Sequence, residues 1–214
     1  RQSMMNSIAP VWDGNETWLV LGGLGLLAAF PVAFAIILPA VYFPILVMLL
    51  ALVFRGVAFE FQFRDAEHRH FWDHAFGIGS AVATFAQGIV LGAFIQGFDV
   101  QGRHFAGGSF DCFTPFSLFT GLALMCGYSL LGACWLILKT EGALAERARR
   151  WARAAFLGTL AAVGVVSLWT PFIDPDIARR WFSWPNILFL SPVPLATAVT
   201  GFLWWRAVAK EQEV

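Results

Sequence analysis

Long apolar runs separated by short polar connections make up most of the chain. Six of these runs approach the roughly 20 residues that a helix needs to cross a bilayer. They cover approximately residues 17–38, 41–63, 74–98, 114–138, 152–172 and 186–205. The pattern predicts an all-α fold, a polytopic transmembrane helical bundle of about six spans, with residues 1–214 as a single transmembrane domain. Pro39 and Pro44 bracket the first connection, which we expect to be a tight hairpin between antiparallel helices.

Small residues recur in the third apolar run at helical spacing. Gly77, Ala81, Thr84, Gly88 and Gly92 lie three or four residues apart, which places them along one side of a helix. A stripe of this kind lets another helix backbone approach closely. We therefore expect this span to pack tightly against a neighbour.

The composition supports a membrane protein. Hydrophobic residues make up 58% of the chain and charged residues 13%, and the charged share is about half that of a typical soluble domain. The net charge of +0 argues against nucleic acid as a partner. The three cysteines form no CxxC pair, so neither a disulfide framework nor a zinc site is predicted.

The basic residues predict an orientation. If the spans alternate in direction, one side receives ten basic residues and the other receives three. The first group is Arg1, Arg64, Arg69, Lys139, Arg147, Arg149, Arg150, Arg153, Arg206 and Lys210, and the second is Arg103, Arg179 and Arg180. Basic loops stay on the cytoplasmic side, so residue 1 is expected there. The basic loop at 139–153 is interpreted as a solvated connection, with docking on anionic lipid as the alternative.

A polar stretch precedes the first span. Asp13 and Glu16 lie three residues apart between Trp12 and Trp18, and Asn15 stands between the two carboxylates. On one face of a helix, two like charges raise at least one pKa, and the pair can then hold a proton. The alternative is that Asp13 or Asn15 caps the helix while the tryptophans lie at the membrane interface.

The second span carries an arginine at membrane depth. Arg55 follows a long apolar run and precedes Glu60 by five residues. An intramembrane arginine is costly and marks a functional or pairing site, unless it extends to the interface. The first hairpin would return Arg55 toward Asp13 and Glu16. Gln87 and Gln96 are expected to form hydrogen bonds between helices.

The histidines argue against haem binding by this chain. Axial ligands of a membrane cytochrome lie within helices, whereas His68, His70, His74 and His104 fall in loops or at span ends. No cysteine or carboxylate spacing supports a metal site at the first three. We therefore expect no metal and no cofactor bound by this chain.

Four motifs carry a resemblance to a known family. The run MNSIAPVWDGNETW at 5–18 and FRGVAFE at 54–60 resemble subunit II of the cytochrome bd-type quinol oxidases. QGIVLG at 87–92 and KTEG at 139–142 are similar to its cyanide-insensitive branch. That family normally has a further helix before these motifs and further helices after them. We therefore expect the chain to be part of a longer protein.

The resemblance implies a function. Subunit II of the family is a non-haem protein of the bacterial cytoplasmic (inner) membrane. Its partner, subunit I, carries haem b and haem d, oxidises quinol and reduces oxygen to water. Subunit II is expected to stabilise subunit I and help supply it with protons or oxygen. The resemblance also leaves open a structural quinone, a small accessory subunit and bound membrane lipids.

The resemblance assigns roles to individual residues. Asp13 matches a proton-entry carboxylate, Trp18 a tryptophan on an oxygen route, and Arg55 an arginine that influences haem integrity. Glu16 is a glutamine in some members of the family. A purely structural assembly subunit is the alternative. A secondary transporter is disfavoured, because transporter sites lie near the midplane, whereas these polar groups cluster at one face.

Overall fold

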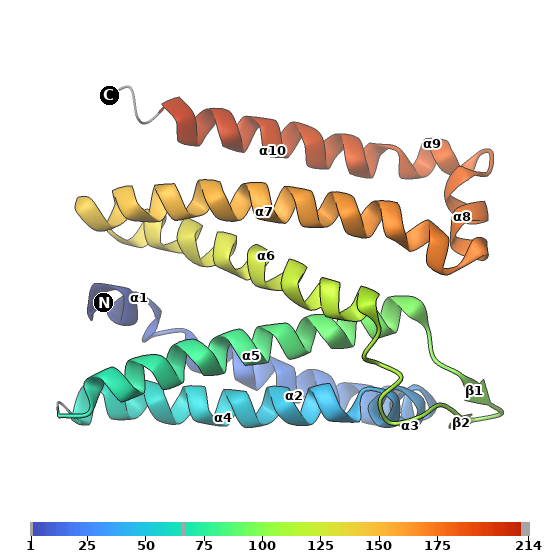
Figure 1. Ribbon diagram of the computed structural model, residues 1–214, viewed down its shortest axis with the longest axis horizontal. Helices are drawn as coiled ribbons and strands as arrows, with labels where there is room; N and C mark the ends of the chain where they lie inside the picture. Colours follow the sequence, from blue (N-terminus) through green and yellow to red (C-terminus); the bar gives the residue numbers. More distant parts are fainter. Residues whose placement is uncertain (1, 66, 211–214) are drawn as a thin grey trace. The chain divides into compact units, whose positions relative to one another are not determined.

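A computed structural model describes residues 2–65 and 67–210, and these residues are almost entirely helical (Figure 1). The helices are α1 (Gln2–Ile8), α2 (Trp12–Ala29), α3 (Pro31–Ala40), α4 (Tyr42–Arg64), α5 (Arg69–Gln96), α6 (Pro115–Lys139), α7 (Ala143–Ile173), α8 (Pro175–Phe182), α9 (Asn186–Leu190) and α10 (Pro192–Lys210). A small antiparallel hairpin, β1 (Val100–Gln101) and β2 (His104–Phe105), lies between α5 and α6. The all-α fold is confirmed.

Five helical segments among the described residues are long and apolar enough to cross a membrane. They are Tyr42–Gln62, Arg69–Gln96, Pro115–Lys139, Ala143–Ile173 and Asn186–Ala207. Their positions agree with the second to sixth predicted spans. The last of them joins α9 to α10.

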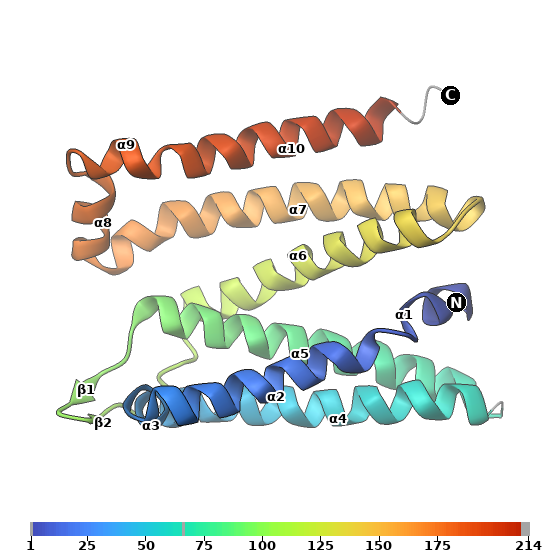
Figure 2. The same cartoon turned by 180° about the vertical axis from the view of Figure 1, so that it is seen from behind.

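The first predicted span is not one helix. The backbone leaves the helical region at Phe30, with φ −134° and ψ 60°, and Pro31 then begins α3. Proline suits the first position of a helix, where no backbone N–H is needed. In Figures 1 and 2, α3 is seen end-on while α2 and α4 run across the view. The expected tight hairpin between antiparallel helices is therefore wrong, because the ten-residue α3 lies crosswise between α2 and α4.

Small residues bring α4 and α5 close together. Met48 and Ala51 of α4 form a buried cluster with Ala83 and Ala86 of α5, and Leu19 of α2 packs against this cluster. A Cβ atom at Gly79 would lie 2.9 Å from the backbone oxygen of Ala51, closer than a side chain allows. The α4–α5 pair is therefore the packed centre of this region.

At two positions, the stripe of small residues on α5 lets another helix backbone approach closely, as predicted. A Cβ atom at Gly88 would lie 2.5 Å from the Cα of Gly121, and one at Gly92 would lie 2.5 Å from the Cα of Ser117. Both partners belong to the first half of α6. A Cβ atom at Gly77 would meet nothing within 4 Å. The stripe therefore seats α6 only along its second half.

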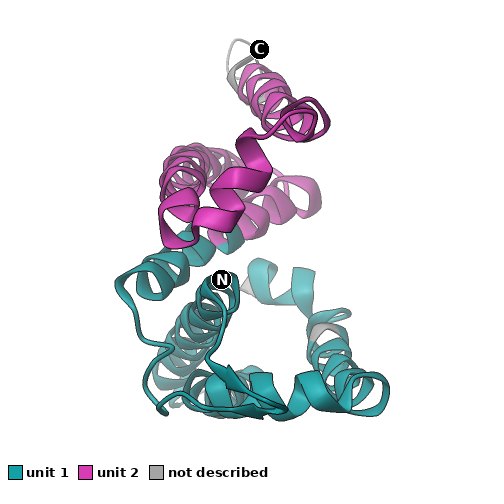
Figure 3. Ribbon diagram, turned by 90° about the vertical axis from the view of Figure 1, so that its right-hand side faces the viewer, with its two compact units in different colours: residues 1–128 teal, residues 129–214 magenta. Residues whose placement is uncertain are grey.

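The chain forms two compact units, residues 1–128 and 129–214 (Figure 3). The first unit holds α1 to α5, the β-hairpin and the beginning of α6. The second holds the end of α6 and α7 to α10. Within the second unit, the Phe156 ring of α7 stacks on Trp204 of α10, with centroids 4.6 Å apart.

Candidate functional site

The polar stretch forms the first turn of α2. Val11 occupies the N-cap position, and no side-chain hydrogen bond caps this helix end in the described structure. The expected capping by Asp13 or Asn15 is therefore wrong, because both residues already lie within the helix. The side chain of Asn15 is outside the described part of the chain. Asp13 is exposed in the first turn, where a negative charge interacts favourably with the helix dipole.

Trp12 fixes the start of α2 on α4. Its ring stacks on Phe59, with centroids 4.9 Å apart and planes inclined by 29°. Its indole also lies 3.6 Å from the position that a Cβ atom at residue 56 would take, in ordinary contact range. Gly56 and Phe59 thus form the surface of α4 on which the polar stretch rests.

Glu16 lies near Arg55, beside this contact. Burial raises the pKa of the Glu16 carboxyl group above its ordinary value, the charge of Arg55 opposes this rise, and the charge of Asp13 adds to it. Glu16 Oε1 and Arg55 Nε are each buried, and neither has a hydrogen-bond partner among the described residues. Buried polar groups are normally paired. The structure therefore brings Arg55 to the opening stretch and leaves unused hydrogen-bonding capacity there.

A ring from α5 completes the surroundings of Arg55. The Cζ atom of Arg55 lies 5.5 Å from the centroid of the Phe76 ring, within the range of a cation–π interaction. The Cβ atom of Arg55 also borders Gly79, 3.4 Å from the position of an added Cβ. Residues from α2, α4 and α5 thus share this site.

Two predicted residues lie outside this site. Glu60 faces solvent and pairs with Arg64 at 3.9 Å, with both side chains more than half exposed. It is therefore not the partner of Arg55, and exposed pairs of this kind contribute little stability. The Trp18 side chain is 71% exposed and is not part of the core of this unit.

Gln62 is a polar residue that the sequence did not single out. It is 4% exposed, and its Nε2 donates to Asp73 Oδ1 of α5 at 2.7 Å. Its Oε1 is buried with no partner in the described chain. Gln62 occurs among phenylalanines in the run FEFQF. A lone amide in an apolar run at a span end is the signal that could have revealed it.

Asp65 organises the connection between α4 and α5. Its carboxylate accepts hydrogen bonds from Trp72 Nε1 at 3.2 Å and from the backbone N–H of His68 at 3.1 Å. These bonds, led by that from Trp72, lower the pKa of Asp65 below its ordinary value. His68 Nδ1 is also 3.1 Å from Asp65 Oδ2. In the described ranges, no group of three His, Cys, Asp or Glu side chains is placed to hold a metal ion.

Gln87 and Gln96 both contact the α6 region. Gln87 Oε1 accepts from the hydroxyl of Tyr128 at 3.0 Å, and Gln96 Oε1 accepts from that of Thr114 at 2.5 Å. The first bond joins α5 to α6, and the second joins α5 to the residue that precedes α6. These amides therefore act in helix packing.

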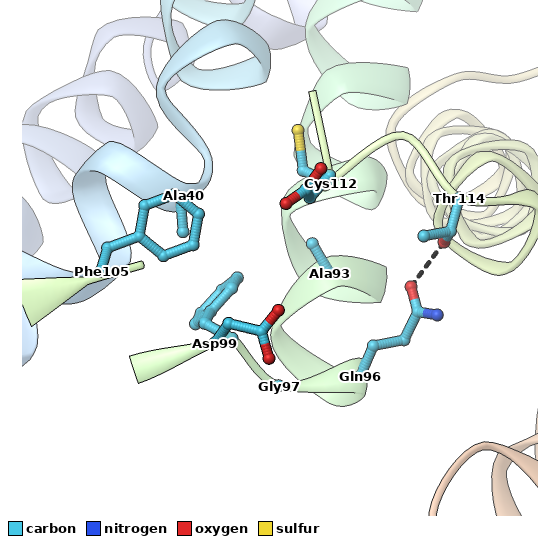
Figure 4. A pocket seen from close by; sticks show the side chains of 10 residues that line it. Ala40, Ala93, Gln96, Gly97, Asp99, Phe105, Cys112 and Thr114 are labelled. Atoms are coloured by element: carbon cyan, nitrogen blue, oxygen red, sulfur yellow. Dashed lines mark hydrogen bonds between the residues drawn. The ribbon is translucent and has the colours of Figure 1, made fainter. Parts of the chain in front are cut away.

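A cavity of about 350 Å³ lies at the end of α5, around Gln96 (Figure 4). The polar or thiol-bearing side chains among its lining residues come from Gln96, Asp99, Asp111, Cys112 and Thr114. The Cys112 thiol is buried, and loss of hydration raises its pKa. Cys112 packs in a buried cluster with Val41 and Ala93.

Comparison with known proteins shows the family. The family model described as "Cytochrome bd terminal oxidase subunit II" matches residues 1–214. This chain belongs to that family. Together with the five apolar helices, the match identifies an integral membrane protein.

Individual relatives in the cytochrome bd subunit II family agree. The chain is 33% identical over 187 residues to cytochrome bd-I ubiquinol oxidase subunit 2 of Escherichia coli K12, covering 84% of this chain and 49% of the relative. It is 31% identical over 213 residues to a probable cytochrome oxidase subunit 2 of Haemophilus influenzae, covering 96% and 56%. It is 32% identical over 157 residues to cytochrome bd ubiquinol oxidase subunit 2 of Bacillus subtilis, covering 72% and 46%. The chain thus spans about half the length of these relatives.

Proposed function

We propose that this chain serves as the non-haem subunit II of a bacterial cytochrome bd-type quinol:oxygen oxidoreductase. In this role it stabilises a haem-bearing subunit I and conducts protons or oxygen toward it. Haem b and haem d of the partner would carry electrons from quinol to oxygen, which is reduced to water with the uptake of protons. Family membership over residues 1–214 supports this function.

The placement of Glu16 near Arg55 is the observation that carries the proton role. A proton path needs groups that accept and release a proton, together with room for water or a further partner between them. Glu16 Oε1 and Arg55 Nε supply unused acceptor and donor capacity in a buried setting. Burial favours the protonated form of Glu16, and Arg55 would oppose this and help the proton to leave, because a nearby positive charge favours the ionised carboxylate.

Asp13 is the proposed entry point. It is exposed one turn before Glu16 on the same helix, so water can deliver a proton to it. From there the proton would pass along α2 toward the partner subunit. The proposed orientation puts this end on the cytoplasmic side of the inner membrane, where the basic residues concentrate.

Trp18 is the proposed contact for the oxygen route. Its ring is 71% exposed on α2, and a large exposed aromatic side chain in a membrane protein faces lipid or another chain. We place subunit I beside it. Binding of a structural quinone, lipids or a small accessory subunit belongs to the same proposal, and none of them requires a cofactor held by this chain.

The test is the variant Asp13→Asn in the assembled oxidase. We expect oxygen consumption to fall by about a hundredfold, the lower end of the range for a lost acid–base group, while haem absorbance per complex stays at the wild-type level. Glu60→Gln is the matched control, because it removes an exposed carboxylate of α4 that lies outside the site. Wild-type turnover of Asp13→Asn at all pH values would refute the proton role and favour a purely structural subunit.

A further inference from the structure

A short helix lies across the ends of two membrane spans in the second unit. Figures 1 and 2 show α8 running between the end of α7 and the α9–α10 segment, while α7 and α10 run across the view. Both neighbours are long and apolar enough to cross a bilayer. A helix at right angles to two spans, at their ends, lies in the plane of the membrane surface.

The sequence gives α8 two opposite faces. Asp174 caps the helix by accepting from the backbone N–H of Asp176 at 2.8 Å, and Pro175 occupies the first turn. At about 100° per residue, the apolar side chains share one half of the helix and the charged ones the other. The apolar half holds Ile177, Ala178, Trp181 and Phe182, and the charged half holds Asp176, Arg179 and Arg180.

The apolar half is uncovered at its end. Phe182 is 67% exposed and Trp181 37% exposed, and Trp184 just after the helix is 76% exposed. Large aromatic side chains that are exposed in this way favour the boundary between headgroups and acyl chains. Exposed aromatic rings and a charged opposite face are together typical of interfacial helices.

The charged half has a free cation. Arg179 pairs with Asp176 at 3.4 Å, with both side chains largely exposed. Asp174 is engaged in the cap. Among the residues that the structure describes, Arg180 has no ion pair with a side chain, so its guanidinium group is available to a ligand. Guanidinium groups bind phosphate oxygens with two parallel hydrogen bonds.

We propose that α8 is an interfacial helix that binds an anionic phospholipid. Arg180 holds the lipid phosphate, Arg179 adds positive charge beside it, and Trp181 and Phe182 insert between the acyl chains. The occupant is a lipid because the arginines and the exposed rings lie on opposite halves of one membrane-parallel helix. The inference does not depend on the proposed oxidase role.

The first test measures how deep the apolar and the charged half of α8 lie in the membrane. Nitroxide labels are attached at Phe182→Cys and, separately, at Arg179→Cys, in full protein with its native partners in nanodiscs of phosphatidylcholine and phosphatidylglycerol. Cys126 and Cys134 are replaced by serine, and Cys112 is 4% exposed. We expect the ratio of oxygen to nickel-chelate collision rates to be several-fold higher at 182 than at 179. Equal ratios, or shielding of both labels from both reagents, would overturn the proposal.

Lipid binding is the second test. Dioleoyl phosphatidylglycerol is titrated into purified protein and bound lipid is counted by native mass spectrometry. We expect Arg180→Gln to weaken this binding at least fivefold relative to phosphatidylcholine, which supplies the same chains without net negative charge. Arg103→Gln is the control, since Arg103 is exposed in the turn between β1 and β2 and its substitution removes the same charge. An equal loss in both variants would mean that the binding is non-specific and would refute the assignment to α8.

Discussion

Gln62 of α4 donates a 2.7 Å hydrogen bond to Asp73 of α5, while its own carbonyl oxygen is buried and unpaired in the described structure. The bond ties together the ends of α4 and α5 that lie nearest their connection.

Replacing Gln62 by Ala should destabilise the protein by about 1–3 kcal/mol, because Asp73 loses a buried donor and a void is left. The measurement is the temperature at which purified protein loses half of its helical circular dichroism. Gln101→Ala in the exposed strand β1 is the control and should leave that temperature unchanged. Equal temperatures for both variants would show that the bond contributes nothing.

Replacing Gly88 by Ala should destabilise the contact between α5 and α6. The added Cβ would meet the Cα of Gly121 at 2.5 Å, and overpacking of this kind costs about 1–3 kcal/mol. Gly77→Ala is a matched control in the same helix, since its Cβ meets nothing within 4 Å. That change should be neutral or stabilising by up to about 1 kcal/mol, because alanine favours helices. The same thermal assay compares the two variants, and an opposite order would contradict this packing.

The lowered pKa of Asp65 predicts that the stability of the fold depends on pH in the acid range. Hydrogen bonds from Trp72 and His68 lower the pKa of Asp65 from its ordinary value of 3.8. The unfolded chain therefore binds a proton at higher pH than the folded one. The contribution to stability is complete above the ordinary value and disappears as the pH falls through the lowered pKa.

Asp65→Asn should remove this part of the acid dependence, whereas Trp72→Phe should only reduce it, because the backbone donor of His68 remains. The measurement is the thermal midpoint of wild type and both variants between about pH 2 and pH 6, around the ordinary range of an aspartate. Parallel curves for wild type and Asp65→Asn would argue against the shift.

Arg55→Leu should lower the haem content of the purified complex. The change leaves Glu16 beside Asp13 without the positive charge that offsets their repulsion. Arg55→Lys should retain more haem, because it keeps the charge but loses the planar guanidinium group over Phe76.

The double variant Arg55→Leu with Glu16→Gln separates two roles of the arginine. If Arg55 acts through Glu16, removing the carboxylate should restore part of the haem absorbance per complex. Haem spectra that stay at the wild-type level in Arg55→Leu would instead remove Arg55 from any role in the haem partner's integrity.

The apolar runs were sufficient to predict the second to sixth spans, because each is long and bounded by charges. They did not predict the break at Phe30, since the chain is apolar on both sides of Pro31 and hydropathy carries no information on helix direction. The capping prediction failed because α2 begins at Trp12, before both candidate caps. The Trp12 ring stacks on Phe59 of α4, a residue far away in the sequence, and a local pattern cannot show that contact.

The meeting of Arg55 with Glu16 could be predicted from the return of the second span, although the connection is a helix rather than a hairpin. Gln62 could be noticed in the sequence as an amide between phenylalanines, but its role could not be predicted. Its importance depends on burial and on Asp73 of the next helix, and neither is visible in a single apolar run. The pairing of exposed Glu60 with Arg64 on the same helix is likewise not visible from an apolar run.

The crosswise α3 also determines how much of α2 the unit itself can cover. At about 1.5 Å per residue, its ten residues span about 15 Å, which exceeds the diameter of a helix of about 10 Å. Trp12 holds α2 against α4 at one end, whereas Leu21, Leu24 and Leu27 beyond it are 46–58% exposed. These side chains are not covered by the unit itself, and the length of α3 sets how far the end of α2 lies from the start of α4.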